Sequence, residues 1–283
     1  MSRPRGGYIG FNRVPAAGAV NSAAIGAWTL REAESFKRAG TWPTSPAIPH
    51  TISGLQLWLD AADSATLFDA TTDGSLVAAD GGVARWEDKS GNGRHATQGT
   101  AERQPLRKTN QQNGLDAILF DGTNDRFSLS SYTIPSSHSA FQVFRRATSG
   151  IQSFGLASTN AVAIPPFPVV WAADNIRYQI SNADFTTHGT ANTSTGYFAF
   201  TTIRTGATSI AMRSNGVSVA TVTTGLGVTN AASGSWNAIG ARDPSFLNLH
   251  TGNLCEVIVY DSALSDANLA AVENYLMSKW GIS

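Results

Sequence analysis

Carboxylates are the residues best suited to do chemistry in this sequence, and the chain has only six Glu. Glycoside hydrolysis needs two carboxyl groups roughly 5 to 10 Å apart. Glu87 and Asp88 are adjacent and therefore point to opposite faces of an expected strand. Glu256 stands alone among apolar neighbours, where we expect a strand-end or surface carboxylate. We therefore predict no catalytic residue and no enzymatic activity.

Other catalytic and cofactor patterns are missing from the sequence. The five His show neither H-x-x-x-H spacing nor pairing with Cys, so a zinc site is not expected. There is no G-x-S-x-G nucleophile elbow, no Walker loop and no dinucleotide-binding glycine fingerprint. The lone Cys255 lies in an apparent core strand, where we expect it to act as a small buried hydrophobe. We predict no cofactor other than the calcium considered below.

The charge and hydropathy of the chain exclude several classes of partner. Charged residues make up 14% of the sequence and the formal net charge is zero, so we expect neither nucleic-acid binding nor attraction to anionic lipid. No run of about 18 apolar residues is present, which predicts no membrane insertion. Near the amino terminus, Asn12, Arg13 and Pro15 interrupt any continuous apolar core, so we expect no export signal.

The elements that must position any site are mostly short strands separated by Gly, Asn and Asp turns. This pattern, with apolar alternation at 141–144 and 197–200, predicts an all-β antiparallel sandwich. The expected strands are 54–60, 82–87, 115–121, 125–130, 139–146, 151–157, 167–172, 176–181, 196–204, 208–213, 216–223, 235–241 and 254–260.

One helix is expected at the carboxyl end of the domain. Ser265 is its predicted N-cap and Gly281 its stop signal. The expected apolar face comprises Leu269, Val272, Tyr275, Leu276 and Trp280. We expect this helix to pack on the sandwich and cover an edge or end.

The turn at 85–98 is the piece around which we expect the first half of the sandwich to be arranged. Its Asp and Asn side chains can hydrogen-bond nearby backbone groups, and its Gly residues can adopt positive φ. It lies between the expected strands 54–60 and 115–121, both of which end in Asp-rich turns.

These segments carry a family resemblance. In order along the chain, the motifs are GLQLWLDA at 54–61, WEDKSGNGRHA at 86–96, FDGTND at 120–125, a hairpin around Asn215-Gly216, NAIG at 237–240, EVIVYD at 256–261 and ALS at 263–265. Together they resemble the laminin-G-like, concanavalin A-like jelly-roll domains. The resemblance implies a jelly-roll sandwich over about residues 50–283 and is hardly specific for a ligand.

The same resemblance implies a calcium site as one alternative, because several laminin-G-like domains bind calcium at a loop rim. An EF-hand is excluded: residues 88–93 match its first six positions except for Ser at the third, but position twelve is Gly99 instead of Glu. Asx turns and strand caps are the role we expect first for these residues. The candidate calcium ligands are Asp88, Asn92, Asp121 and Asp125, with Asp60, Asp63 and Asn124 in neighbouring turns.

Carbohydrate recognition is the chemistry that the sequence favours, because aromatic faces and short polar side chains suit sugar C–H and hydroxyl groups. The candidate residues are Trp171, Asp174 and Tyr178, within or just after the segment 167–175. Trp171 also fits a core position on an alternating strand, and we expect that role first.

A separate leader precedes the sandwich. Thr29 and Glu32 form a capping box, which predicts a short helix over 30–39 that stops at Gly40. A Pro-rich link, 41–49, follows. Large apolar residues on so small an element need a docking surface from another chain or from the main domain.

The leader motifs GGYIGF at 6–11, WTLREA at 28–33 and RAGTWP at 38–43 resemble the leaders of tailed-phage structural proteins. This resemblance implies a virion-anchoring arm. The arm residues are Tyr8, Ile9, Phe11, Trp28, Leu30 and Trp42. The alternative is that the arm packs on its own jelly roll and anchors nothing.

These observations predict two parts, an anchoring arm with helix and link at 1–49 and a jelly roll at 50–283. The leading hypothesis is a non-enzymatic virion protein, a head decoration or tail fibre, with other virion proteins, further copies of itself and a host-surface glycan as partners. A bacterial extracellular glycan-binding lectin module is the second hypothesis. A polysaccharide-degrading enzyme is the third.

Overall fold

The structure is a computed structural model that describes the chain from residue 49 onward, with gaps. The described residues are 49–133, 135, 137–147, 195–206, 209–222, 235–241 and 249–283, with the strand backbones of 156–157, 167–170, 175–179 and 185–191. The chain divides after Ile48 into two units, and all described residues belong to the second, Pro49–Ser283. The predicted anchoring residues Tyr8, Ile9, Phe11, Trp28, Leu30 and Trp42 and the expected helix at 30–39 lie outside them.

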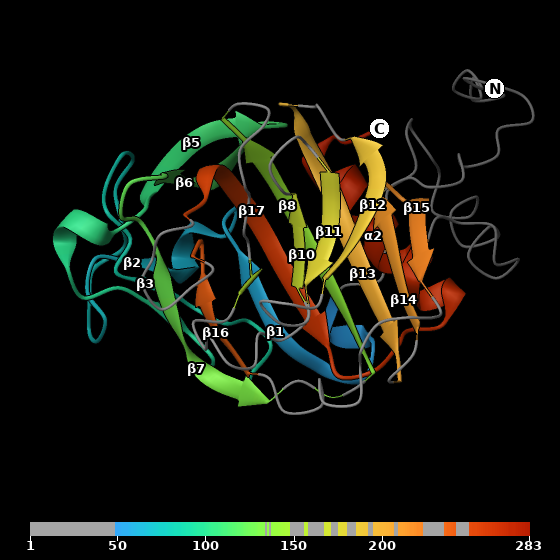
Figure 1. Cartoon of the computed structure of the whole chain (residues 1–283). Helices are drawn as coiled ribbons and strands as arrows, with labels where there is room; N and C mark the ends of the chain where they lie inside the picture. Colours follow the sequence, from blue (N-terminus) through green and yellow to red (C-terminus); the bar gives the residue numbers. More distant parts are fainter. Residues whose placement is uncertain are drawn as a thin grey trace, which may run out of the picture. The chain divides into compact units, whose positions relative to one another are not determined.

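The largest sheet is antiparallel and has eight strands among the described residues, in the order β15-β14-β13-β8-β17-β6-β5, with β1 also paired to β17 (Figure 1). Its strands are β1 (Leu55–Asp60), β5 (Leu106–Gln112), β6 (Leu115–Asp121), β8 (His138–Arg146), β13 (Tyr197–Thr205), β14 (Ser209–Ser214), β15 (Val217–Val222) and β17 (Thr251–Tyr260). The strand β17 lies at its centre: β8 pairs along one side of it, and β6 and β1 share the other.

Two smaller sheets accompany it. The six-stranded sheet has the order β2-β3-β4-β7-β16-β9 and the three-stranded sheet has the order β10-β11-β12. Their strands are β2 (Leu67–Phe68), β3 (Arg85–Trp86), β4 (Ala96–Thr97), β7 (Phe127–Thr133), β9 (Leu156–Ala157), β10 (Phe167–Val170), β11 (Asn175–Gln179), β12 (Phe185–Ala191) and β16 (Ser235–Ile239). Short 3-10 turns complete the described part: η2 (Pro49–Thr51), η3 (Ser64–Thr66) and η4 (Ala101–Arg103).

The hydrophobic core lies between the eight-stranded and six-stranded sheets. Leu254, Val257 and Val259 of β17 enter it from one side, and Trp86 and Phe127 enter it from the other. Strand alternation alone would put Leu254 and Glu256 on one face. The register of β17 against β8 shifts between these two residues, and this β-bulge turns Glu256 to the outer face of the sheet.

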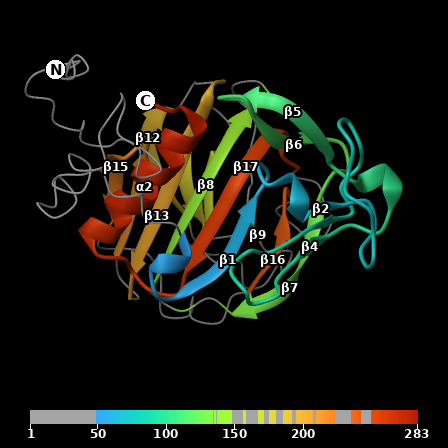
Figure 2. The same ribbon diagram turned by 180° about the vertical axis from the view of Figure 1, so that it is seen from behind.

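The helix α2 (Asp266–Trp280) covers that outer face, as Figure 2 shows from behind. Its predicted signals are confirmed: the side chain of Ser265 accepts a hydrogen bond from the Asn268 amide, and Gly281 ends the helix at φ 60°. The buried residues of the helix are Leu269, Val272, Glu273, Leu276 and Trp280. No helix in the described part of the chain, α2 included, is long and apolar enough to cross a membrane.

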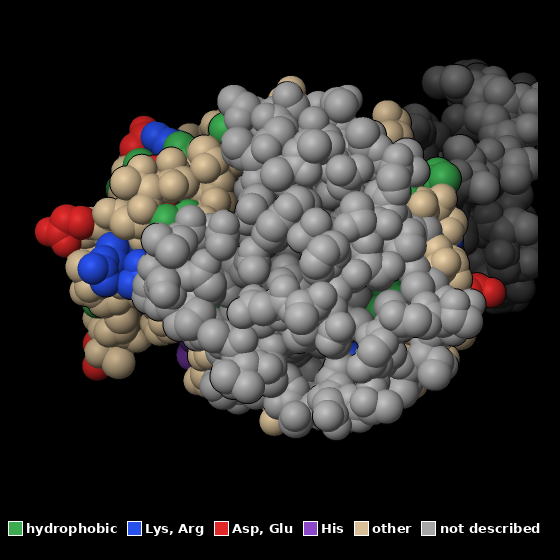
Figure 3. Space-filling model, in the orientation of Figure 1, with side chains coloured by type: hydrophobic (Ala, Val, Ile, Leu, Met, Phe, Trp, Pro, Cys, Tyr) green, Lys and Arg blue, Asp and Glu red, His purple; other side chains and the backbone are tan. Residues whose placement is uncertain are grey.

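The predicted antiparallel sandwich with a carboxyl-terminal helix is confirmed, and so is the hairpin turn at Asn215-Gly216, where φ is 48° and 73°. Four strands were not predicted: the two-residue β2 and β4, and the longer β5 and β12. The sequence of β5, LRKTNQQ, has little apolar alternation because it forms an edge of the sheet and none of its side chains is fully buried. On the face drawn in Figure 3, the described residues show blue and red side chains near one another and no broad hydrophobic patch.

Candidate functional site

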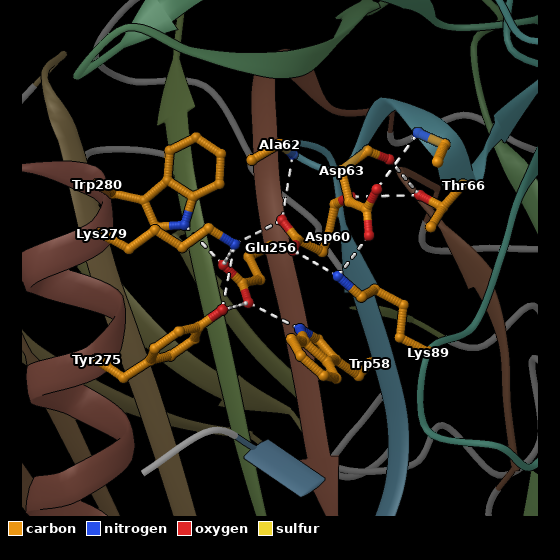
Figure 4. A network of polar contacts seen from close by, with 11 residues as sticks. Trp58, Asp60, Ala62, Asp63, Thr66, Lys89, Glu256, Tyr275, Lys279 and Trp280 are labelled. Atoms are coloured by element: carbon orange, nitrogen blue, oxygen red, sulfur yellow. Dashed lines mark hydrogen bonds and ion pairs between the residues drawn. The ribbon is translucent and has the colours of Figure 1, made fainter. Parts of the chain in front are cut away.

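Glu256 is the centre of a polar network between the large sheet and α2 (Figure 4). Its Oε1 accepts hydrogen bonds from the Trp58 indole N–H at 2.8 Å and the Tyr275 hydroxyl at 2.9 Å. Its Oε2 accepts from Lys279 Nζ and from the Trp280 indole N–H, both at 2.8 Å. Four donors from one strand and one helix therefore surround a single carboxylate.

A second carboxylate, Asp60, joins the network through two lysines. Lys279 Nζ lies 2.6 Å from Asp60 Oδ1 and so bridges Asp60 to Glu256. Lys89 Nζ lies 3.0 Å from Asp60 Oδ2 and 2.7 Å from Asp63 Oδ2, and it also sits 4.5 Å from the ring centroid of Trp58. Charges of both signs alternate, so each cation contacts two anions.

Burial dominates the electrostatics of this network. Loss of water raises the pKa of Glu256, the neighbouring Asp60 charge raises it further, and Lys279 opposes both effects. Burial would by itself lower the pKa of Lys89, but Asp60 and Asp63 hold it above its usual value. Burial is also the main reason that the pKa of the Tyr275 hydroxyl is raised.

The prediction of Glu256 as an isolated strand-end or surface carboxylate is wrong. Its exposed fraction is 0% and that of Asp60 is 4%, because the bulge in β17 turns Glu256 under α2. All four favourable acceptor positions of Glu256 are already used, so its carboxyl group has no free position for a substrate. The arrangement joins α2 to the sheet, and a fully satisfied network of this kind makes that packing specific.

The turn at 85–98 has the role that its sequence predicted. Asp88 Oδ1 accepts from the amides of Trp58 and Ser90, both at 2.9 Å, and Oδ2 accepts from Ser90 Oγ at 2.8 Å and the Arg94 amide at 3.0 Å. Asn92 Nδ2 donates to the carbonyl of Leu55 at 3.0 Å. Asp88 and Asn92 therefore fasten the turn to the start of β1.

The other two candidate calcium ligands serve a different turn. Asp121 Oδ1 accepts from the amides of Thr123, Asn124 and Asp125, and Asp125 Oδ2 accepts from the Asp121 amide at 2.9 Å. Burial raises the pKa of Asp125 to about 6. Within the described part of the chain, no group of three or more His, Cys, Asp or Glu side chains is arranged to hold a metal ion.

Two of the three predicted carbohydrate-binding residues lie outside the described residues. Trp171 and Asp174 lie beyond the described residues. The backbone of Tyr178 lies on β11, paired with Pro168 and Thr186. Cys255 is buried as expected.

The sequence did not reveal Lys89, Tyr275 and Lys279 as members of a site. Glu256 and Trp58 are 198 positions apart, so no local pattern joins them. The one local signal was the spacing of Tyr275, Lys279 and Trp280, which lie about one turn or less apart on the predicted helix.

No protein-family model matches the sequence, and no curated protein matches it. Among solved structures, the chain is similar to domain 4 of AbnA, a GH43 extracellular arabinanase from Geobacillus stearothermophilus, in complex with arabinotriose. The TM-score is 0.54 at 14% identity, over 77% of this chain and 98% of that domain.

Two further structures are similar over parts of their length. A Trypanosoma rangeli sialidase with 2,3-difluorosialic acid has a TM-score of 0.53 at 10% identity, over 84% of this chain and 34% of the sialidase. A tryptophan-to-alanine mutant of HCR/D has a TM-score of 0.52 at 10% identity, over 79% of this chain and 51% of that one. The chain thus spans about a third of the sialidase and about half of the HCR/D chain. At identities this low, the similarity establishes the β-sandwich fold alone.

Proposed function

We propose that this chain is a non-enzymatic carbohydrate-binding protein that displays its β-sandwich on a tailed-phage virion. The observation that carries the carbohydrate part is the match to domain 4 of the arabinanase. The match covers 98% of that domain, which was solved in complex with arabinotriose. The similarity thus extends over a whole domain that holds a saccharide.

The absence of catalysis in this proposal rests on how the carboxylates are used. Glu256 and Asp60 are buried and bound by the lysines and indoles of the α2 network. Glu87 forms an ion pair with Arg85 at 3.2 Å, and the adjacent Asp88 holds its own turn. A retaining or inverting glycosidase needs one carboxyl group free to protonate the leaving oxygen, and each of these four already has a hydrogen-bonding or ion-pair partner.

The virion part of the proposal rests on the leader motifs at 6–11, 28–33 and 38–43. In this view the arm binds other virion proteins, and the sandwich faces a host-surface glycan. Several copies would then be displayed together, and multivalent binding multiplies a weak affinity for each sugar.

The first test is binding of the full-length protein to an array of host-cell, bacterial and plant glycans that includes arabino-oligosaccharides. We expect at least one glycan to be retained, and mass spectrometry to find its length unchanged. Wells without sugar serve as controls. Retention of no glycan would contradict carbohydrate binding, and shortened products would replace the proposal with a polysaccharide-degrading enzyme.

The second test is immunogold labelling of particles from the source culture with an antibody to residues 50–283. We expect label on the particle: label on the head indicates a decoration protein and label on the tail a fibre. Protein found free or on cells, with unlabelled particles, would contradict the virion role and favour a bacterial extracellular lectin.

A further inference from the structure

The inner face of the large sheet changes character along β13. Phe198 and Phe200 belong to the hydrophobic core. Because alternate residues of a strand share a face, Thr202 and Arg204 continue the same row, and both are buried with exposed fractions of 1%. In Figure 1 the three-stranded sheet β10-β11-β12 lies in front of the upper and middle part of β13, on the side opposite α2. The row thus runs from an apolar region into a polar one.

Arg204 is a buried cation whose hydrogen bonding is incomplete. Its Nε donates to the Gly206 carbonyl at 3.0 Å, but its buried Nη1 has no partner. No carboxylate among the described residues forms an ion pair with it. Thr202 Oγ1, two residues earlier on the same face, is likewise buried without a partner. Two adjacent positions of one row therefore present unused hydrogen-bonding groups.

The titratable residue opposite Arg204 on the neighbouring strand does not neutralise it. His138 lies opposite Arg204 in the register of β8 and β13. Burial, with a further contribution from the Arg204 charge, lowers the pKa of His138 to about 4. The imidazole is therefore neutral near pH 7 and brings no negative charge to the guanidinium.

Three partly buried cations of the sandwich have carboxylate partners. Arg213 pairs with Glu273 at 2.8 Å, Arg107 with Asp116 at 2.7 Å, and Lys279 with both Asp60 and Glu256. Burying a charge without a partner is unfavourable by several kcal/mol in proteins generally. A position that keeps such a charge is explained if a ligand supplies the missing anion.

We propose that Arg204 binds the carboxylate of an acidic saccharide, with the Thr202 hydroxyl as a second contact. A planar guanidinium matches a carboxylate in a two-point hydrogen-bonded pair. Arg204 lies one residue before the exposed end of β13 at Thr205, and the space next to Gly206 is open, with no atom within 4 Å of where a Cβ would stand. In this proposal the ligand approaches from this end of the strand. This inference rests on the proposed carbohydrate binding and specifies its substrate class.

The test measures thermal unfolding and calorimetric binding of the full-length protein with glucuronate, glucose and acetate at constant ionic strength. We expect glucuronate to raise the unfolding temperature and glucose to leave it nearly unchanged. In Arg204→Met, glucuronate affinity should fall at least about tenfold, as expected for loss of a charge-assisted pair. Thr202→Val, which keeps the side-chain shape, should weaken binding several-fold.

The ligand-free variant separates a binding role from a structural one. If Arg204 awaits an anion, Arg204→Met without ligand unfolds at the same or a higher temperature, because the uncompensated charge is gone. A lower unfolding temperature, or failure to fold, would assign the guanidinium a structural role and overturn the inference. The matched control Arg85→Met removes a cation that already pairs with Glu87 and should leave the glucuronate effect unchanged.

The remaining outcomes distinguish this inference from the proposed function. Binding of neutral glycans with no dependence on a carboxylate would overturn the inference and leave carbohydrate binding intact. Equal stabilisation by acetate and glucuronate would reveal a bare anion site and overturn the saccharide ligand. No glycan retained on the array, together with no binding of glucuronate, would overturn the proposed function and the inference together.

Discussion

Replacing Lys279 with methionine is expected to lower the free energy of unfolding by about 3 to 5 kcal/mol, because it leaves two buried carboxylates without their shared cation. Lys279 Nζ contacts Asp60 at 2.6 Å and Glu256 at 2.8 Å. Asp60 keeps Lys89 as a partner, but Glu256, with an exposed fraction of 0%, keeps only neutral donors. Urea unfolding followed by near-ultraviolet circular dichroism measures the change.

The control for this prediction is Lys108→Met. It removes an equally short ion pair, with Asp80 at 2.6 Å, but the Asp80 side chain is 71% exposed. Solvent screens such a pair, so we expect a loss below about 1 kcal/mol. Similar losses in the two variants would contradict the view that the buried network fastens α2 to the sheet.

The double variant Glu256→Gln with Lys279→Met tests whether the two groups act together. Once Glu256 is neutral, loss of the lysine no longer leaves a bare charge at that position. The two effects should therefore combine to less than their sum, with a coupling of about 1 kcal/mol or more. Additive effects would indicate that the methionine substitution acts through lost packing alone.

Much of the fold was predictable because its signals are local. Asn215-Gly216 can adopt the positive φ that a tight hairpin needs. Ser265 caps the helix with a side-chain hydrogen bond, and Gly281 stops it because glycine readily adopts positive φ. β5 was missed because its residues face solvent at an edge, where no apolar periodicity is required. The strand is identified by its pairing with β6, which is a property of the folded chain.

The Asp88 turn and the Glu256 network show the same difference between local signals and contacts made only in the folded chain. Asp88 contacts residues two and six positions away, so its Asx geometry could be inferred from the local sequence. The Glu256 network joins Trp58, Tyr275 and Lys279. It depends on a β-bulge that the residue types in β17 do not predict. Strand alternation alone would put Glu256 on the inner face with Leu254, but one unpaired residue, Cys255, reverses the faces beyond it.

Arg204, which has no counter-charge among the described residues, was partly predictable from the sequence. Alternation from Phe198 through Phe200 already places it on the inner face, so its burial could be inferred from sequence. Its lack of a counter-charge could not be inferred from the sequence, because every possible partner is distant in the chain. Local patterns therefore predict which face a group occupies, and only the folded structure identifies the partner it meets.

Acidification from pH 7 to pH 5 is expected to cost about 2 kcal/mol of stability for each of two buried histidines, His138 and His250. Burial lowers the pKa of each to about 4 from an ordinary value of 6.5. The folded state therefore binds fewer protons than the unfolded chain between these values. The stabilisation is complete above pH 6.5 and is lost as the pH falls towards 4.

Carboxyl groups act in the opposite direction, so the histidine effect must be measured as a difference between variants. The folded pKa of Asp125 is raised to about 6 from 3.8, and that of Glu256 is also raised. These groups take up protons more readily when folded, so they add stability as the pH falls through that window and offset part of the loss. The raw profile of the wild-type protein reports the sum of both effects.

The variant that isolates one histidine is His250→Phe. His250 packs edge-on against Phe120 at 5.4 Å and Phe144 at 6.1 Å, so a third aromatic ring retains the shape of the cluster. We expect the loss of unfolding free energy between pH 7 and pH 5 to shrink by about 2 kcal/mol in this variant. Phe120→Leu, which disturbs the same cluster without removing a titratable group, should lower stability by similar amounts at both pH values. An unchanged pH dependence in His250→Phe would mean that the imidazole is protonated within the fold, and its burial would then require an anionic partner.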